Sequence, residues 1–300
     1  MKIKGIITAM VTPLNEDGIN EQATRKLVEH LIGQGIHGLF ILGTNGEFFS
    51  LTDDEKITLT KIVVDQTKGR VPIFAGAGGI STKGVIDLIH RFEAIGGIDA
   101  VSVITPYLLK FTDEELISHY QTIAQNTALP IILYNIPANT GINIDEKVFS
   151  QLVETPSIIA IKDSSGNLEN FEKYLKINQR EDFSLLMGSD SKIARAVQMG
   201  ADGAVASTSN VLAKTDVAIY ELAVAGKMDE AYQLQETIDD FRNICKIGTV
   251  PSGLKACLRT IGFEVGQPKL PILDVSAETK EKIRQVLLQY EESEGLSILK

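Results

Sequence analysis

Cysteine, basic residues and long apolar runs are all scarce in this chain of 300 residues. Cys245 and Cys257 are its only cysteines, which excludes a disulfide framework and a cysteine-based zinc site. We interpret both as reduced thiols, which are typical of a cytoplasmic protein. No apolar run approaches the roughly 18 residues that a membrane helix needs, so we expect no membrane partner.

The charge balance is acidic. The chain carries 29 basic and 39 acidic residues, a formal net charge of -10. Nucleic acids and anionic membrane surfaces attract clustered lysine and arginine, and this chain has neither an excess nor a run of them. We therefore expect no nucleic-acid partner. An anionic small substrate is still compatible with the composition, because a small pocket sets its own field.

Short apolar runs recur along the chain, each followed by turn residues and an amphipathic segment. Continuous apolar runs are typical of strands that are buried on both faces. The first run lacks a cleavage site and is interrupted by Thr8, so we interpret it as a strand and not as an export signal. The eight candidate strands are residues 5–11, 38–42, 71–75, 100–104, 130–134, 158–161, 184–187 and 203–206.

Helical segments alternate with these strands. Thr52 and Thr112 are each followed three residues later by glutamate, the capping box that begins a helix. Eight strand–helix units predict an α/β fold, the (β/α)8 or TIM barrel, with an open doubly wound sheet as the alternative. The predicted helices between the strands are residues 21–33, 53–67, 83–95, 113–126, 145–152, 168–178 and 192–199.

No further strand follows residue 206. We predict a barrel over residues 1–224 and a C-terminal helical domain or extension over residues 225–300, with no linker between them. The predicted helices in this part of the chain are residues 215–225, 229–246, 254–261 and 277–292.

Two apparent ligand motifs lack the context that they need. The G-x-G-x-x-G in residues 33–38 follows a predicted helix and precedes a strand, which is the reverse of a dinucleotide site. His30, His37, His90 and His119 lie neither at metal-ligand spacing nor at the C-terminal ends of predicted strands. We therefore predict neither a bound nucleotide nor a metal.

Polar residues at three strand ends point to catalysis. Lys162 ends one predicted strand, and apolar walls around its ammonium would favour the free amine, a nucleophile. Tyr134 ends the neighbouring strand, about 5 Å away, so its phenol can shuttle protons near the lysine nitrogen. Thr44, Asn45 and Gly46 offer a hydroxyl, an amide and backbone N–H groups, which together can hold a carboxylate. Each feature alone has an ordinary explanation, such as an ion-paired lysine or a turn.

Six spaced motifs give the chain a family resemblance. In order along the chain it resembles the dihydrodipicolinate synthase / N-acetylneuraminate lyase superfamily of class I Schiff-base aldolases. The motifs are residues 43–47 (GTNGE), 105–107 (TPY), 134–141 (YNIPANTG), 161–164 (IKDS), 188–190 (GSD) and 250–255 (VPSGLK).

The resemblance implies a lyase of the (β/α)8 fold that acts on pyruvate and other 2-oxo acids. It implies a covalent lysine Schiff base in place of any metal or cofactor, and a cytoplasmic homo-oligomer, either a tetramer or a dimer. Lys162 stands at the position of the Schiff-base lysine and Tyr134 at that of the catalytic tyrosine. Thr44 and Asn45 stand where the family holds the substrate carboxylate, and Val205 where a small apolar residue forms the floor of the site.

The branch within the superfamily is harder to assign. Dihydrodipicolinate synthases typically carry arginine at the position of Asn139 and a second threonine at that of Asn45. Many members carry a relay tyrosine at the position of Leu108, which cannot carry a proton. Asn45, Asn139 and Ser164 are instead similar to 4-hydroxy-2-oxoglutarate aldolases, in which the asparagine and serine contact substrate.

We therefore expect reversible aldol cleavage of a 4-hydroxy-2-oxo acid to pyruvate, or a related 2-oxo acid, and an aldehyde. The first alternative is 4-hydroxy-tetrahydrodipicolinate (dihydrodipicolinate) synthase activity, which condenses pyruvate with aspartate semialdehyde. Sialate lyase and 2-keto-3-deoxygluconate lyase activities are further alternatives. A protein that binds a 2-oxo acid without catalysis is the last, and Leu108 is the feature that favours it.

Overall fold

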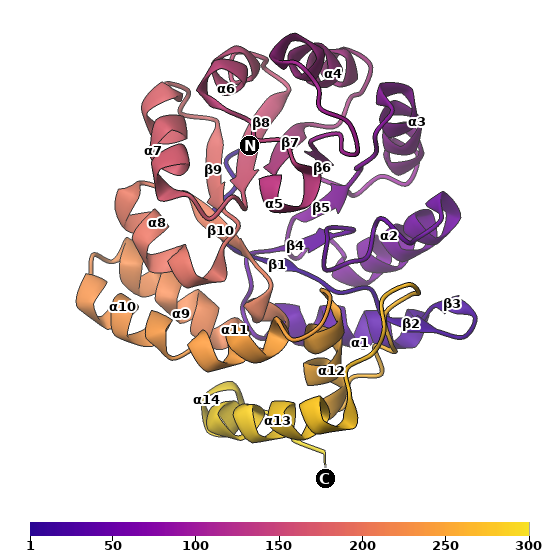
Figure 1. The fold of residues 1–300 in the computed structure, drawn as a ribbon, viewed down its shortest axis with the longest axis vertical. Coiled ribbons are helices and arrows are strands. Elements are labelled where there is room, and N and C mark those ends of the chain that lie inside the picture. Colours follow the sequence, from indigo (N-terminus) through magenta and orange to yellow (C-terminus); the bar gives the residue numbers. More distant parts are fainter. Residues whose placement is uncertain (300) are drawn as a thin grey trace.

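The computed structural model describes residues 1–299, and Figure 1 shows its central barrel. Eight parallel strands form a closed barrel in the order β1-β10-β9-β8-β7-β6-β5-β4, so the predicted (β/α)8 barrel is confirmed and the open sheet is excluded. The strands are β1 (Gly5–Ala9), β4 (Gly38–Ile41), β5 (Ile73–Gly76), β6 (Ala100–Ile104), β7 (Ile131–Asn135), β8 (Ile158–Asp163), β9 (Ser184–Met187) and β10 (Gly203–Ala206).

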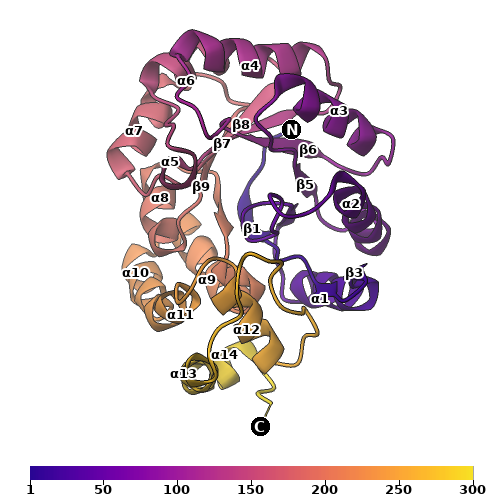
Figure 2. The same cartoon turned by 45° about the vertical axis from the view of Figure 1, so that its right-hand side comes forward.

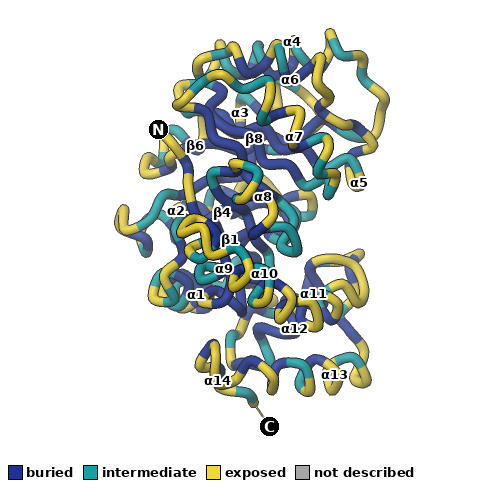
Figure 3. The backbone as a smooth tube through the Cα atoms, turned by 90° about the vertical axis from the view of Figure 1, so that its left-hand side faces the viewer, coloured by how far each residue is buried: buried dark blue, intermediate teal, exposed yellow. Residues whose placement is uncertain are grey.

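The barrel strands are buried along their whole length, which explains their continuous apolar runs (Figure 3). The ring closes where β1 pairs with both β10 and β4. At this seam a Cβ on Gly203 would lie 2.2 Å from the carbonyl oxygen of Gly5, so only glycine allows the two strands to approach.

An outer ring of helices covers the barrel. Thr52 and Thr112 begin α2 and α4 with the predicted capping boxes, in which Glu55 and Glu115 accept hydrogen bonds from the N–H groups of these threonines. The helices of the ring are α1 (Glu21–Gly33), α2 (Asp53–Thr67), α3 (Thr82–Glu93), α4 (Asp113–Gln125), α6 (Glu146–Leu152), α7 (Leu168–Ile177), α8 (Ile193–Met199) and α9 (Ala213–Val224).

The C-terminal helices gather at one side of the barrel next to α9 (Figure 2). Apolar residues of this part and of the barrel belong to one continuous core. The division at residue 224 therefore stays a prediction. These helices are α10 (Met228–Glu236), α11 (Asp239–Cys245), α12 (Ser252–Thr260), α13 (Ala277–Leu287) and α14 (Glu291–Glu294).

The structure differs from the sequence prediction in several short elements. The helix predicted over residues 229–246 is two helices, and at the break the N–H groups of Thr237 and Ile238 donate to the carbonyls three residues earlier, as in a 3₁₀ turn. A small hairpin of β2 (Leu14–Asn15) and β3 (Gly18–Ile19) and the one-turn helix α5 (Pro137–Thr140) were not predicted. Among the helices of residues 1–299, none combines the length and the apolar character of a membrane-spanning segment.

Candidate active site

A cavity of about 740 Å³ opens at the C-terminal ends of the barrel strands, where barrel enzymes carry their active sites. We call it the barrel cavity. Its walls come from strand ends, from the loop after β4 and from residues 246–250 between α11 and α12. Of the predicted site residues, those that line it are Thr44, Asn45, Tyr134, Asn139, Lys162, Ser164 and Val205.

Lys162 lies deep in this cavity on β8, and its residue is only 4% exposed. Its Nζ lies 4.0 Å from the ring centroid of Tyr134 and 4.3 Å from that of Phe40. Among residues 1–299, no carboxylate comes within ion-pair distance of Lys162. The nitrogen is therefore enclosed by two aromatic rings and is not tied up in an ion pair.

Tyr134 on β7 pairs in register with Lys162 on β8, so both side chains point to the same side of the sheet. We expected the phenol near the lysine nitrogen. The structure places the ring face over Nζ and the Tyr134 hydroxyl 3.2 Å from the Thr44 hydroxyl. The tyrosine therefore connects the amine to the loop that carries Thr44.

The loop of residues 43–47 presents Thr44 and Asn45 to the barrel cavity, and both are half-buried. Gly46 does not line the cavity: it is buried, and its carbonyl accepts a hydrogen bond from the Thr12 hydroxyl at 2.7 Å. A Cβ on Gly46 would lie 2.9 Å from the backbone nitrogen of Leu42. The glycine therefore allows the tight turn that directs Thr44 and Asn45 toward the barrel cavity.

The outer part of the barrel cavity combines neutral polar groups with one carboxylate, that of Asp190. Asn139 in α5 is exposed at the rim, and the half-buried Ser164 hydroxyl donates to the Gly188 carbonyl at 3.4 Å. Asp190 and Ser207 also line this part, and sequence reasoning did not assign them. The Asp190 carboxylate accepts from the Ser207 hydroxyl at 2.6 Å and from its N–H at 3.0 Å. The GSD motif contained Asp190, but no spacing in the sequence indicated its pairing with Ser207.

The segment after α11 supplies the remaining wall. Lys246, Thr249 and Val250 line the barrel cavity and are exposed at its mouth. Lys246 is the second lysine of the cavity, and within the described part of the chain it forms no ion pair. Sequence reasoning did not assign these residues to the site, although Val250 begins the motif of residues 250–255, because only the packing of the tail brings them to the mouth.

Leu108 lies outside the barrel cavity, in the loop between β6 and α4. Its residue is 84% exposed and that of Leu109 is 63% exposed. Leu108 has a φ of 84°, in the left-handed region that leucine rarely adopts. Within a single chain, Leu108 therefore contributes no group to the site.

Asn135 and Asp163 stand behind the two reactive residues, each one position further along its strand and facing outward. The Asn135 amide donates to the Asp163 carboxylate at 2.9 Å, and the Ser165 hydroxyl donates to it at 2.8 Å. Burial raises the pKa of Asp163. This bonded pair fixes the ends of β7 and β8 and so holds Tyr134 and Lys162 side by side.

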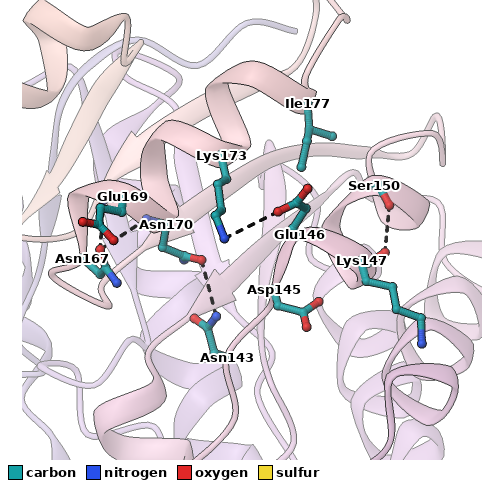
Figure 4. A pocket seen from close by; sticks show the side chains of 10 residues that line it. All are labelled: Asn143, Asp145, Glu146, Lys147, Ser150, Asn167, Glu169, Asn170, Lys173 and Ile177. Atoms are coloured by element: carbon teal, nitrogen blue, oxygen red, sulfur yellow. Dashed lines mark hydrogen bonds and ion pairs between the residues drawn. The ribbon is translucent and has the colours of Figure 1, made fainter.

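A second hollow, the α6–α7 groove, lies on the outside of the barrel and measures about 690 Å³ (Figure 4). Its polar side chains engage one another: Lys173 lies 3.5 Å from Glu146, and the Asn143 amide donates to Asn170 at 3.4 Å. Because these groups already bond one another, the barrel cavity is the better candidate for catalysis. Across the described chain, no group of three or more histidine, cysteine, aspartate or glutamate residues could hold a metal ion.

A model of the dihydrodipicolinate synthetase family matches residues 2–290. The chain belongs to this family. The 4-hydroxy-tetrahydrodipicolinate synthase 1 of Halalkalibacterium halodurans is 35% identical over 94% of this chain and 96% of its own length. The 4-hydroxy-tetrahydrodipicolinate synthase of Listeria welshimeri is 33% identical over 99% of this chain and 100% of its own.

Solved structures agree with this assignment. Dihydrodipicolinate synthase from Thermotoga maritima has a TM-score of 0.92 and 28% identity, over 96% of this chain and 98% of that one. A structure described as a monomeric dihydrodipicolinate synthase variant has a TM-score of 0.93 and 27% identity, over 98% of both chains. This chain is therefore a carbon–carbon lyase of the class I aldolase type, from a family that uses a lysine Schiff base with pyruvate and no separate cofactor.

Proposed function

We propose that this lyase condenses pyruvate with aspartate semialdehyde, as a 4-hydroxy-tetrahydrodipicolinate synthase does. The names of its relatives support this reaction over the aldol cleavage that the sequence motifs favoured. The observation that carries the Schiff-base step is the buried Lys162 amine, which has no carboxylate partner among the described residues and lies 4.0 Å from the Tyr134 ring.

The reaction begins when Lys162 Nζ attacks the C2 ketone of pyruvate. The carbinolamine loses water and becomes an iminium, which withdraws electrons from C3 so that a C3 proton leaves and an enamine forms. The enamine carbon then attacks the aldehyde carbon of the second substrate, so that the new C–C bond forms, the enamine returns to an iminium and the aldehyde oxygen takes a proton. The amino group of aspartate semialdehyde then attacks the iminium carbon, which closes the ring of the product and releases Lys162 as the free amine. The Tyr134 hydroxyl gives and takes the protons of these steps, through its 3.2 Å contact with Thr44.

Thr44 and Asn45 hold the pyruvate carboxylate in this proposal. Their position at the cavity wall would turn the ketone toward Lys162, and such orientation can supply several kcal/mol of the barrier. Val205, which is buried on β10, forms the apolar floor. Ser164 and Asn139 contact the distal part of the second substrate.

Aldol cleavage of a 4-hydroxy-2-oxo acid is the second candidate. It is favoured by Asn139, an uncharged side chain at the rim where synthases typically carry arginine. A neutral amide holds a distal carboxylate more weakly than a bidentate arginine does. The same Lys162 iminium would serve this reaction, since it accepts electrons equally well from a breaking C3–C4 bond.

Turnover of the purified chain on two substrates tests the choice. We expect faster condensation of pyruvate with aspartate semialdehyde than release of pyruvate from 4-hydroxy-2-oxoglutarate. The opposite ranking would establish the cleavage reaction. Reduction with borohydride in the presence of pyruvate should leave an adduct on Lys162, whereas saturable binding without an adduct would indicate a non-catalytic binding protein.

We also propose that the enzyme is a cytoplasmic homo-oligomer. Leu108 and Leu109 expose adjacent apolar side chains, and exposed apolar surface of this kind is often covered by a partner. A second copy of the chain is the partner that the family resemblance implies. Sedimentation velocity measures the assembly directly, and a stable monomer at micromolar concentration would contradict this part of the proposal.

A further inference from the structure

A fully buried ion pair joins the loop of residues 43–47 to the C-terminal helices. Lys255 in α12 donates from Nζ to Oε1 of Glu47 at 2.7 Å, and both side chains have 0% exposure. The other Glu47 oxygen accepts the backbone N–H of Lys269 at 2.7 Å. Nζ of Lys255 also donates to the Gln267 carbonyl at 3.0 Å. A single carboxylate on the loop is thus held by two separate parts of the tail.

Stability alone is a weak explanation for such a pair. Removing two charges from water costs several kcal/mol per ion, and well-packed apolar residues at such sites often stabilise a protein at least as much. The cost is visible at Lys255, because burial lowers the pKa of its ammonium even though Glu47 opposes this shift. A pair of this kind does define one geometry, since each charge requires the other at a fixed place.

The loop that carries Glu47 needs such a constraint. Glu47 and Leu42 both have a φ of 57°, in the left-handed region that is unfavourable for residues other than glycine. Strained backbone of this kind persists only where the surroundings hold it in place. Between these two residues lies Thr44, whose carbonyl accepts the Glu47 N–H at 3.1 Å and whose hydroxyl contacts Tyr134.

We propose that Glu47 and Lys255 are positioning residues, whose ion pair holds Thr44 against Tyr134 and aims it at the substrate carboxylate. Neither residue lines the barrel cavity, so both act through the backbone of the loop. This role rests on the proposed function, because Thr44 is the residue that receives pyruvate. It makes the C-terminal helices part of the pyruvate site.

Substitutions should separate positioning from stability. Glu47→Gln keeps the shape of the side chain but removes the charge opposite Lys255, and Lys255→Met removes the ammonium. We expect KM for pyruvate to rise about 10-fold to 100-fold in each, with a smaller fall in kcat, because a displacement of about 1 Å can cost 100-fold. The double variant leaves no buried charge of this pair. If the pair served stability only, the double variant would recover the KM of the unchanged chain.

A double-mutant cycle with Thr44→Val tests the route of the effect. If Glu47 acts through Thr44, Glu47→Gln should raise KM much less when position 44 is already valine. Additive losses in the two variants would overturn the proposal. Asp274→Asn is the matched control: Asp274 also acts on the Lys255 charge, but it pairs with Arg259 at 2.5 Å and with Lys280 at 2.9 Å, and within the described chain it has no bond to the loop of residues 43–47. We expect this control to leave KM for pyruvate unchanged.

Amide hydrogen exchange in the substrate-free protein gives a second readout that needs no activity. Exchange of residues 43–48 should rise at least about 10-fold in Glu47→Gln and Lys255→Met, and not in Asp274→Asn. Unchanged exchange in both pair variants would overturn the positioning role, whatever the chain does with pyruvate. If instead the unchanged chain forms no borohydride-trapped adduct, the proposed function fails, and the exchange data still decide whether the pair holds the loop.

Discussion

The barrel cavity and the α6–α7 groove have similar volumes, about 740 and 690 Å³, but their polar side chains are arranged in opposite ways. In the groove, Asn167 and Asp145 cap α7 and α6, and Lys173 faces Glu146 (Figure 4). In the cavity, Lys162 lies against two aromatic rings and forms no ion pair among residues 1–299, while the Asp190 carboxylate of the same cavity is bonded to Ser207. Polar groups that satisfy one another leave little for a ligand, whereas a buried amine without a counter-charge can react.

The strongest test of this comparison exchanges one lysine in each hollow. Lys162→Ala should abolish turnover and the borohydride-trapped pyruvate adduct, because the variant has no amine deep in the barrel cavity to attack the ketone. Lys173→Ala in the α6–α7 groove is the control and should form the adduct normally. Peptide mass analysis locates the adduct, and an adduct on Lys246 in the Lys162→Ala variant would assign the nucleophile to the cavity mouth.

Removal of the Tyr134 hydroxyl comes next in expected size. Tyr134→Phe keeps the ring that covers Lys162 but removes the group that contacts Thr44, so proton transfer should suffer more than binding. We expect kcat to fall by about 10²–10⁴-fold, the usual range for a general acid–base group. Steady-state kinetics measure this, and a near-native kcat would transfer the proton shuttle to another residue.

The third prediction concerns His119, a buried histidine outside both hollows, whose substitution should change stability but not activity. Burial in α4 lowers the pKa of His119 from 6.5 to about 4. The folded protein keeps the His119 ring neutral, whereas the unfolded chain protonates it below about pH 6.5. The free energy of unfolding is therefore fully retained above pH 6.5 and decreases as the pH falls toward 4. The loss should reach about 3 kcal/mol, from 1.36 kcal/mol per pKa unit.

Urea denaturation between neutral pH and pH about 4 measures this loss. His119→Gln should show a shallower decrease of unfolding free energy with acidity than the unchanged chain. If the unfolding free energy fell equally with pH in the two proteins, the loss of stability in acid would come from the carboxylates and not from His119. Turnover at neutral pH should be similar in both, because His119 does not line the barrel cavity and its ring nitrogen bonds to Thr82.

The smallest effects are expected in the α6–α7 groove. Lys173 and Glu146 are more than half exposed, so their pair should contribute at most about 0.5 kcal/mol. Lys173→Met and Glu146→Gln should leave kcat and KM within about two-fold and the denaturation midpoint nearly unchanged. A loss of activity as large as that of a cavity variant would show that the groove takes part in the reaction.

The sequence indicated the barrel through eight continuous apolar runs, each followed by a helical segment, although an open doubly wound sheet has the same runs and only the observed strand order excludes it. Helix starts were equally clear where Thr52 and Thr112 carry capping boxes. The break between α10 and α11 was not predicted, because the sequence pattern is helical throughout and only the backbone bonds of Thr237 and Ile238 change there.

The candidate site also contains residues that could be predicted from the sequence and residues that could not. Lys162, Tyr134 and Thr44 could be predicted from strand ends and motifs, since parallel strands bring their C-terminal ends to one rim. Lys246 could not be predicted, because the tail folds back over the rim through tertiary packing. The roles assigned to Asn139, Ser164 and Val205 stay predictions until substrates are tested.

Because of the ion pair between Glu47 and Lys255, the barrel cannot be separated from the C-terminal helices without loss. A barrel expressed without its tail would keep the carboxylate inside the fold while losing both the ammonium and the Lys269 N–H that neutralise it. It would also lose one side of the substrate entrance. Exchange of tails between related lyases should therefore alter how each one handles pyruvate, and the catalytic unit of this chain is the barrel together with its tail.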